Sequence, residues 1–265
     1  MPDREHERSG FFDNSRVVSR AFGAIGAHPL IYLGLALILA GIPGFLSGWW
    51  QFDLQSAVDP ENPRSAFARY LTTDFWLHAS AMWGVATICG AILQAALTRA
   101  TATHLAGRTP SFVESLETGL TLIVPMVVLS LIMGIAVFIG CILLIVPGVM
   151  LWLCWSVLLQ ARVQERIDTF DAFRRSAELT SGHRGNIFLT FLVVTIGLVV
   201  FNWITHKILG GMLGASTSQP MFALVESLIT TVSNMVIITF QASVYVELRT
   251  LKDGVAPNEL ATIFA

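Results

Sequence analysis

From Thr118 to Ala161 the chain reads TGLTLIVPMVVLSLIMGIAVFIGCILLIVPGVMLWLCWSVLLQA, without one charged residue. A helix that crosses a bilayer needs about 20 mainly apolar residues, because the hydrocarbon core is about 30 Å thick and a helix rises about 1.5 Å per residue. The stretch is therefore long enough to cross twice. We expect the break between Ile139 and Gly148, where Pro147 and Gly148 supply turn residues, and a kink at Pro125.

The composition of the whole chain agrees with a bilayer environment. Its 265 residues are 54% hydrophobic and 13% charged, with a mean hydropathy of +0.67, whereas soluble domains are about 25% charged. The sequence predicts an all-α, polytopic membrane helix bundle with about six transmembrane helices. The expected spans are residues 29–49, 75–98, 118–140, 141–163, 186–205 and 222–248, within a membrane domain of residues 13–250. Residues 1–12 are expected to form a disordered cytoplasmic tail and residues 251–265 a cytoplasmic C-terminal tail.

The distribution of basic residues predicts the orientation of these spans. With the N-terminus inside, thirteen basic residues fall on the cytoplasmic segments and three fall outside, namely Arg64, Arg69 and Lys207. Cytoplasmic loops carry an excess of lysine and arginine in membrane proteins. We therefore expect both termini on the cytoplasmic side.

Three short amphipathic stretches precede the first, third and fifth spans. They begin near Asn14, Ser111 and Thr169, and the pair Ser111 and Glu114 has the spacing of a capping box, which marks a helix start. Stretches of this kind lie in the membrane interface as cytoplasmic helices. The chain is therefore expected to contain three units, each a short interfacial helix followed by a hairpin of two spans.

The second, fourth and last spans end on similar tripeptides, which supports this three-fold hairpin repeat. Each tripeptide contains a glutamine, at Gln94, Gln160 and Gln241. An amide both donates and accepts hydrogen bonds, so three of them can join hairpins without burying a charge. The sequence predicts that these glutamines meet at the cytoplasmic end of the bundle, either as glue between hairpins or as a gate.

A polar stripe runs along the last span. Glu226 is an acid inside the predicted span, and Thr230, Asn234 and Gln241 follow it at helical spacing. Intramembrane acids usually have a function or a partner. Two interpretations stay open: a path for a solute or proton, or a seam of interhelical hydrogen bonds, each contributing about 0.6 kcal/mol.

The sequence offers little for catalysis or metal binding. The three cysteines lie in apolar runs without a CxxC pair, the histidines show no HExxH spacing, and no nucleotide-binding loop is present. An enzyme would need an outer-face pocket that joins Asp74, His78 and Glu226, with His206 as a further neighbour. The sequence predicts no cofactor, no metal site and no nucleic-acid partner.

Two segments resemble a known family. Val146-Pro147-Gly148 is followed by DAFRRSAELTSG at 171–182, and YVELR at 245–249 is followed by Lys252-Asp253-Gly254. This pattern is similar to the bacterial family named after the membrane domain of glycerophosphoryl diester phosphodiesterase, although Val246 replaces a tyrosine and Asp253 a glutamate of its motif. The resemblance implies a multi-pass protein of the bacterial inner membrane. It does not carry over the phosphodiesterase activity, because no catalytic barrel is expected here.

Two functions follow as hypotheses. The first is a non-enzymatic module that associates with membrane lipids or envelope proteins, with headgroup contacts from basic residues of the interfacial helices. These residues are Arg16, Arg20, Arg174, Arg175 and Arg184. The alternative is a transporter or channel for a small solute or protons that uses the polar stripe. A membrane-protein partner and a homo-oligomer are both compatible with the sequence.

Overall fold

A computed structural model describes residues 12–56, 70–213 and 219–254, and within these ranges it contains helices and no strand. Six of the described helical segments are long and apolar enough to cross a membrane. They are Pro29–Gln51, Thr73–Leu105, Ile123–Leu143, Ile145–Glu165, Arg184–Ile208 and Pro220–Asp253. The predicted all-α fold with six spans is confirmed, and the chain is a multi-pass membrane protein.

Each span is built from one or more helices. The first span comprises α3 (Pro29–Ala36), the π-helical turn η2 (Leu37–Gly41) and α4 (Ile42–Ser56), and the second span is α6 (Thr73–Leu105). The third span is α8 (Ile123–Leu143), and the fourth comprises α9 (Ile145–Cys154) and α10 (Leu158–Glu165). The fifth and sixth spans are α12 (Arg184–Leu213) and α13 (Gln219–Asp253). Short helices α2 (Asn14–Ala27), α7 (Phe112–Thr121) and α11 (Thr169–Thr180) precede the first, third and fifth spans. These are the positions that the repeat predicts.

Prolines begin several of these helices. Pro29, Pro125 and Pro147 lie in the first turns of α3, α8 and α9, where a backbone N–H has no intrahelical partner to lose. Two expectations were therefore wrong. The chain breaks at Leu122 instead of kinking at Pro125, so residues 118–121 belong to α7 and not to the third span. The turn between the third and fourth spans falls within the predicted interval, but Pro147 and Gly148 do not form it. The turn is the single extended residue Leu144, with φ −161° and ψ 138°.

Gly148 serves close packing instead of the turn. A Cβ placed on it would lie 2.7 Å from the backbone nitrogen of Cys141 and would also overlap its Sγ. The backbones of α8 and α9 therefore touch directly. Such contact between helices in a membrane requires a residue without a side chain at the crossing.

A second close contact joins the first span to the last. Pro43 follows η2 and has no N–H for the carbonyl four residues earlier, which accounts for the wider π-helical turn before it. Ser227 donates to the carbonyl of Gly41 at 2.6 Å. Glycines of the first span then face small residues of α13 in antiparallel order: Gly41 with Thr231, Gly44 with Ser227 and Gly48 with Ala223.

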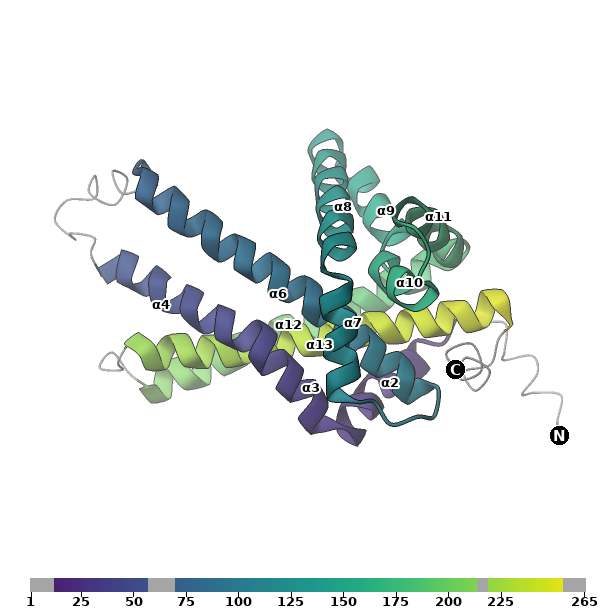
Figure 1. Cartoon of the computed structure of the whole chain (residues 1–265), viewed down its shortest axis with the longest axis horizontal. Helices are drawn as coiled ribbons and strands as arrows, with labels where there is room; N and C mark the ends of the chain where they lie inside the picture. The colour runs from purple at the N-terminus through teal and green to yellow at the C-terminus, as the bar shows by residue number, and fades with distance from the viewer. Residues whose placement is uncertain (1–11, 57–69, 214–218, 255–265) are drawn as a thin grey trace.

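The buried core lies at one end of the molecule. We call this end the base; it is formed by α2, α10, α11 and the C-terminal ends of α6 and α13. The spans extend away from it in two directions, with α8 and α9 rising apart from α4, α6, α12 and α13 (Figure 1). In α6, buried side chains begin at Ala91 and continue to Ala102, whereas the described residues before Ala91 are not buried. Packing is therefore densest at the base and loosest at the far ends.

The ends of the membrane domain differ from the prediction. Phe12, expected in a disordered tail, is buried against the core, and α13 continues to Asp253, whose carboxylate pairs with Arg249 at 3.6 Å. The remainder of both predicted tails, residues 1–11 and 255–265, lies outside the described residues.

The predicted capping box at Ser111 is not formed. Ser111 is the residue before α7, but its side chain makes no capping hydrogen bond. Asp13 instead caps α2, accepting from the backbone N–H groups of Ser15 at 2.9 Å and Arg16 at 3.2 Å. Hydrogen bonds from the Ser15 hydroxyl and these N–H groups hold the pKa of Asp13 below its usual value.

Candidate functional site

The structure brings Gln94, Gln160 and Gln241 together. The side-chain oxygen of Gln241 accepts a hydrogen bond from the amide of Gln94 at 2.9 Å and another from the amide of Gln160 at 3.3 Å. These residues, which we call the glutamine cluster, come from α6, α10 and α13. One carbonyl oxygen thus links the second, fourth and last spans, each at the position that the repeat indicated.

A cavity of about 430 Å³ lies on one side of the glutamine cluster, between the first span, α6 and α13. We call it the chamber. Its polar lining residues are Ser47, Gln94, Thr230, Asn234 and Gln241, and the other lining residues are apolar. Among the described residues, no charged side chain contributes to the lining. The chamber therefore offers hydroxyl and amide groups in an otherwise hydrocarbon-like environment.

Three residues of the predicted polar stripe line the chamber, but Glu226 does not. The Glu226 carboxylate lies 3.2 Å from the Nε2 of His206 on α12, and both side chains are partly exposed. His78 contacts the backbone carbonyl of Asp74 on its own helix at 2.8 Å. Across the described parts of the chain, no group of three or more histidine, cysteine, aspartate and glutamate side chains is arranged to hold a metal ion.

Polar side chains continue from the glutamine cluster toward the base. One turn beyond Gln160, the amide of Gln164 donates to the backbone carbonyl of Thr98 on α6 at 3.1 Å. One turn beyond Gln241, the Tyr245 hydroxyl donates to Glu165 at 2.9 Å. Gln160, Gln164, Thr98 and Tyr245 are all buried. The seam between α6, α10 and α13 therefore carries hydrogen-bonding groups through the most tightly packed part of the protein.

Ion pairs close this seam at the base. Arg175 of α11 binds Glu165 at 2.9 Å and also pairs with Asp253 at the end of α13. Partial burial lowers the pKa of Arg175, but the hydrogen bonds to Asp253 and Glu165 more than offset it, so the pKa is raised above its usual value. The Arg175 guanidinium therefore ties α10, α11 and α13 together.

A second ionic site was missed by the sequence reasoning. Glu247 is fully buried, and its two carboxylate oxygens bind Arg16 at 3.0 Å and Arg20 at 2.6 Å. The available signal was an acid near the end of the last span and two arginines one turn apart on α2. Nothing in the sequence pairs segments that lie more than 200 residues apart.

The arginines expected at lipid headgroups thus have mixed surroundings. Arg16, Arg20 and Arg175 are engaged as described, and the exposed Arg174 pairs with Asp171 and Glu178 on its own helix. For Arg184, the buried Nε atom has no hydrogen-bond partner among the described residues. Headgroup contact by these residues stays a prediction, but most of them already serve the packing of the base.

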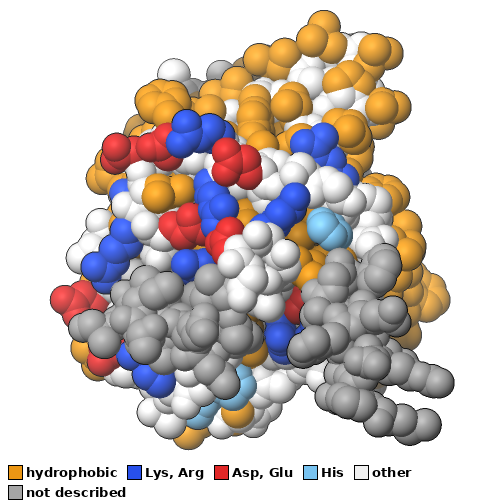
Figure 2. Space-filling model, turned by 90° about the vertical axis from the view of Figure 1, so that its right-hand side faces the viewer, with side chains coloured by type: hydrophobic (Ala, Val, Ile, Leu, Met, Phe, Trp, Pro, Cys, Tyr) orange, Lys and Arg blue, Asp and Glu red, His pale blue; other side chains and the backbone are white. Residues whose placement is uncertain are grey.

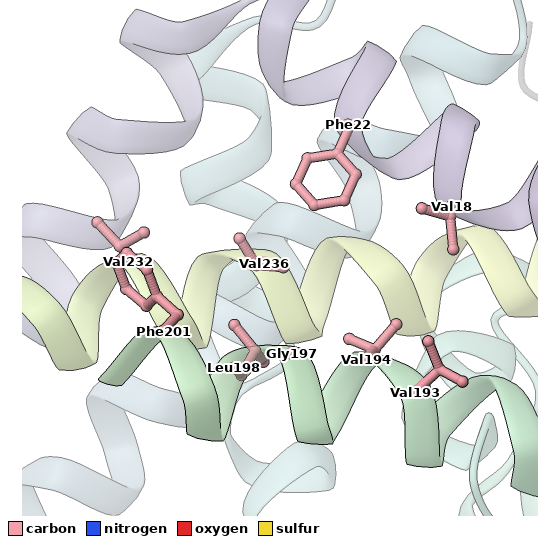
Figure 3. Close-up of a pocket in the computed structure, with 9 residues that line it drawn as sticks. All are labelled: Val18, Phe22, Val193, Val194, Gly197, Leu198, Phe201, Val232 and Val236. Carbon is pink, nitrogen blue, oxygen red and sulfur yellow. The ribbon is translucent and has the colours of Figure 1, made fainter. Parts of the chain in front are cut away.

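An apolar groove of about 450 Å³ lies on another face of α13, between α2, α12 and α13. Figure 3 shows Val18 and Phe22 of α2 facing Gly197 and its neighbours on α12. The described lining residues of this groove are apolar, so their side chains offer no hydrogen bonds to a ligand. Of these two cavities, the chamber is the one with polar groups in its described lining.

Replacing Gln241 with Leu is expected to destabilise the protein by about 1–3 kcal/mol, because the buried Gln160 amide and the Gln94 amide lose their shared acceptor. Thermal unfolding in detergent, followed by tryptophan fluorescence, measures this loss. Thr230→Val changes an exposed residue of the same helix and serves as the control. Equal melting temperatures for the two variants would show that the amide contacts contribute nothing.

Comparison of the chain with family models, curated proteins and solved structures finds no match. The resemblance to the phosphodiesterase membrane domain therefore rests on the two motifs alone. The six apolar helices make the chain a multi-pass helical membrane protein.

Proposed function

We propose that the protein conducts a small uncharged polar solute across the membrane, with the chamber as the entrance and the glutamine cluster as the closed constriction. The observation that carries this proposal is the lining of the chamber. Hydroxyl and amide groups face it, and none of its described lining residues is charged. Transfer of an ion from water into such a site costs several kcal/mol without a counter-charge, whereas a neutral solute can exchange hydrogen bonds with water for hydrogen bonds with the lining.

Size and position support the same function. About 430 Å³ lies within the range of roughly 300–1,000 Å³ that small-molecule sites occupy. The seam of buried polar groups beyond the glutamine cluster extends from the chamber toward the base. We propose that the base faces the cytoplasm, in line with the arginine asymmetry, and that the membrane is a bacterial inner membrane, as the resemblance implies.

Gly90→Leu tests the chamber directly. Gly90 lines the chamber, and a Cβ on it would meet nothing within 4 Å, so the larger side chain can fill the chamber without displacing the helices. In proteoliposomes, stopped-flow light scattering reports the entry of glycerol or urea. We expect the intact protein to accelerate entry and Gly90→Leu to return it to the rate of empty vesicles.

Gly84→Leu is the matched control, because it places the same side chain in open space on the same helix outside the chamber lining. It should conduct like the unaltered protein. If vesicles with the protein admit glycerol and urea no faster than empty vesicles, conduction of such solutes is wrong. If Gly84→Leu and Gly90→Leu lose conduction equally, the chamber is not the path.

A further inference from the structure

The glutamine cluster leaves part of its hydrogen-bonding capacity unused. The side-chain oxygen of Gln241 accepts from both Gln94 and Gln160, which occupies its two lone pairs. Within the described ranges, the amide nitrogen of Gln241 donates to no other residue, and Gln241 lines the chamber. Where it borders the glutamine cluster, the chamber therefore meets an amide that can donate hydrogen bonds but has no lone pair left to accept one.

Other polar side chains of the chamber are unengaged as well. Three of them form no hydrogen bond to any residue that the structure describes: Ser47, Thr230 and Asn234. Asn234 lies about two helical turns before Gln241 on the same face of α13. Its side chain therefore offers the chamber both an amide oxygen that accepts and an amide nitrogen that donates.

Amide and hydroxyl groups without partners are costly within a bilayer, because hydrocarbon offers them no hydrogen bonds. The residue beside Asn234 shows the usual arrangement. Ser233 accepts from Asn202 of α12 at 3.0 Å and donates to the carbonyl of Ile229 at 3.0 Å. The chamber, in contrast, gathers several polar groups whose hydrogen bonds the surrounding protein does not supply. This property is typical of a binding site for a polar molecule.

Recognition in the chamber depends on hydrogen bonds and not on charge. Basic and acidic side chains gather over the base, as Figure 2 shows, whereas none of the described lining residues of the chamber is charged. The pattern of donors and acceptors therefore decides which neutral solutes the chamber favours.

The hydrogen bonds of the glutamine cluster have a form that urea can replace. In this cluster one carbonyl oxygen, that of Gln241, accepts N–H groups from two amides. The carbonyl oxygen of urea accepts two N–H groups in the same way, and its two nitrogens donate side by side to a single oxygen. A hydroxyl group accepts two hydrogen bonds but donates only one. When the cluster opens, urea can therefore replace the bonds on both sides, whereas a hydroxyl leaves Gln241 one donor short.

We infer that the chamber and the glutamine cluster select urea and related primary amides over polyols. The inference rests on the proposed conduction and names its substrate class. The solute lies in the chamber with its carbonyl oxygen toward the Gln241 N–H groups and its own N–H groups toward the side-chain oxygen of Asn234. Asn234 is then a residue that determines specificity, because its amide has no competing partner among the described residues.

Stopped-flow light scattering of proteoliposomes with urea and with ethylene glycol, which have the same number of non-hydrogen atoms, tests this selection. Each rate is taken relative to empty vesicles. We expect the protein to accelerate urea about tenfold more than ethylene glycol, the factor that one or two net hydrogen bonds amount to. Asn234→Leu should reduce this preference to about twofold and keep the fold, because the Asn234 side chain has no hydrogen bond to a described residue to lose. Asn234→Gln keeps an amide in the chamber and should retain the preference.

Asn202→Leu is the matched control, since it makes the same change at an asparagine of α12 that is outside the described lining of the chamber. It should keep the preference of the unaltered protein. If urea and ethylene glycol are accelerated equally, the inference is overturned and conduction stands. If neither solute is accelerated, the proposed function fails and the inference fails with it. An unchanged preference in Asn234→Leu, or an equal loss in Asn202→Leu or Asn234→Gln, also overturns selection by the Asn234 amide.

Discussion

Replacing Glu247 with Gln is expected to lower the free energy of unfolding by about 3 kcal/mol, because a buried carboxylate that two arginines share is lost. The Glu247 side chain is fully buried, whereas those of Arg16 and Arg20 keep 37% and 21% of their surface exposed. Water therefore still solvates the guanidinium groups of Arg16 and Arg20 in part after the carboxylate is removed. The expected loss of stability lies for this reason at the lower end of the range for broken buried ion pairs. The N-terminal helix α2 should lose its ionic attachment to α13 and keep the apolar contacts of Val17 and Ala21.

Thermal and denaturant unfolding in detergent, followed by tryptophan fluorescence, measures this loss. Glu226→Gln is the matched control: it removes an acid from the same helix, but that carboxylate is 43% exposed and, among the described residues, pairs with His206. Exposed pairs contribute about 0–1 kcal/mol. A melting temperature for Glu247→Gln equal to that for Glu226→Gln would contradict an essential ionic contact at the base.

Replacing Gly148 with Ala is expected to cost about 3 kcal/mol, because the new Cβ would lie 2.7 Å from the backbone nitrogen of Cys141 and 2.9 Å from its Cα. A flexible side chain can move aside, but here α9 itself must move away from α8. The hairpin depends on this contact, since much of the surface of both helices faces away from the rest of the protein. The same unfolding assay measures the loss.

Gly134→Ala provides the comparison for Gly148→Ala. Gly134 also lies in the third span, and a Cβ on it would meet nothing within 4 Å. Alanine lowers the entropy cost of ordering a helix, so this variant should gain about 0.5–1 kcal/mol. Opposite signs for the two glycines are the expected result, and a similar change in both would refute the role of backbone contact in the hairpin.

At prolines and glycines, local sequence rules predicted the right position for the turn but the wrong structural role for the residue. The break between the third and fourth spans falls within the predicted interval, but Leu144 makes the turn and Pro147 begins the next helix. The sequence predicts a turn residue at Gly148, and the structure shows a packing residue there. A turn and a close helix contact both favour glycine, so composition alone cannot distinguish them.

The candidate site was predictable in part. The repeat in the sequence indicated Gln94, Gln160 and Gln241, and their hydrogen bonds join the three spans. The stripe on α13 indicated Thr230 and Asn234, but the chamber also needs Ser47 from the first span and open space beside Gly90. A cavity is the volume that packed side chains leave empty, and no pattern within one helix reports it.

The number of crossings and the three short helices before alternate spans followed from the sequence. These properties are local, since a bilayer selects apolar stretches of sufficient length and amphipathic stretches at its surface. The partners of polar groups were decided by the tertiary structure alone: Glu247 with Arg16 and Arg20, and the lining of the chamber. The hydrocarbon core favours the entry of apolar segments, but it does not favour one pairing of apolar helix faces over another. These contacts therefore arise only when the helices pack.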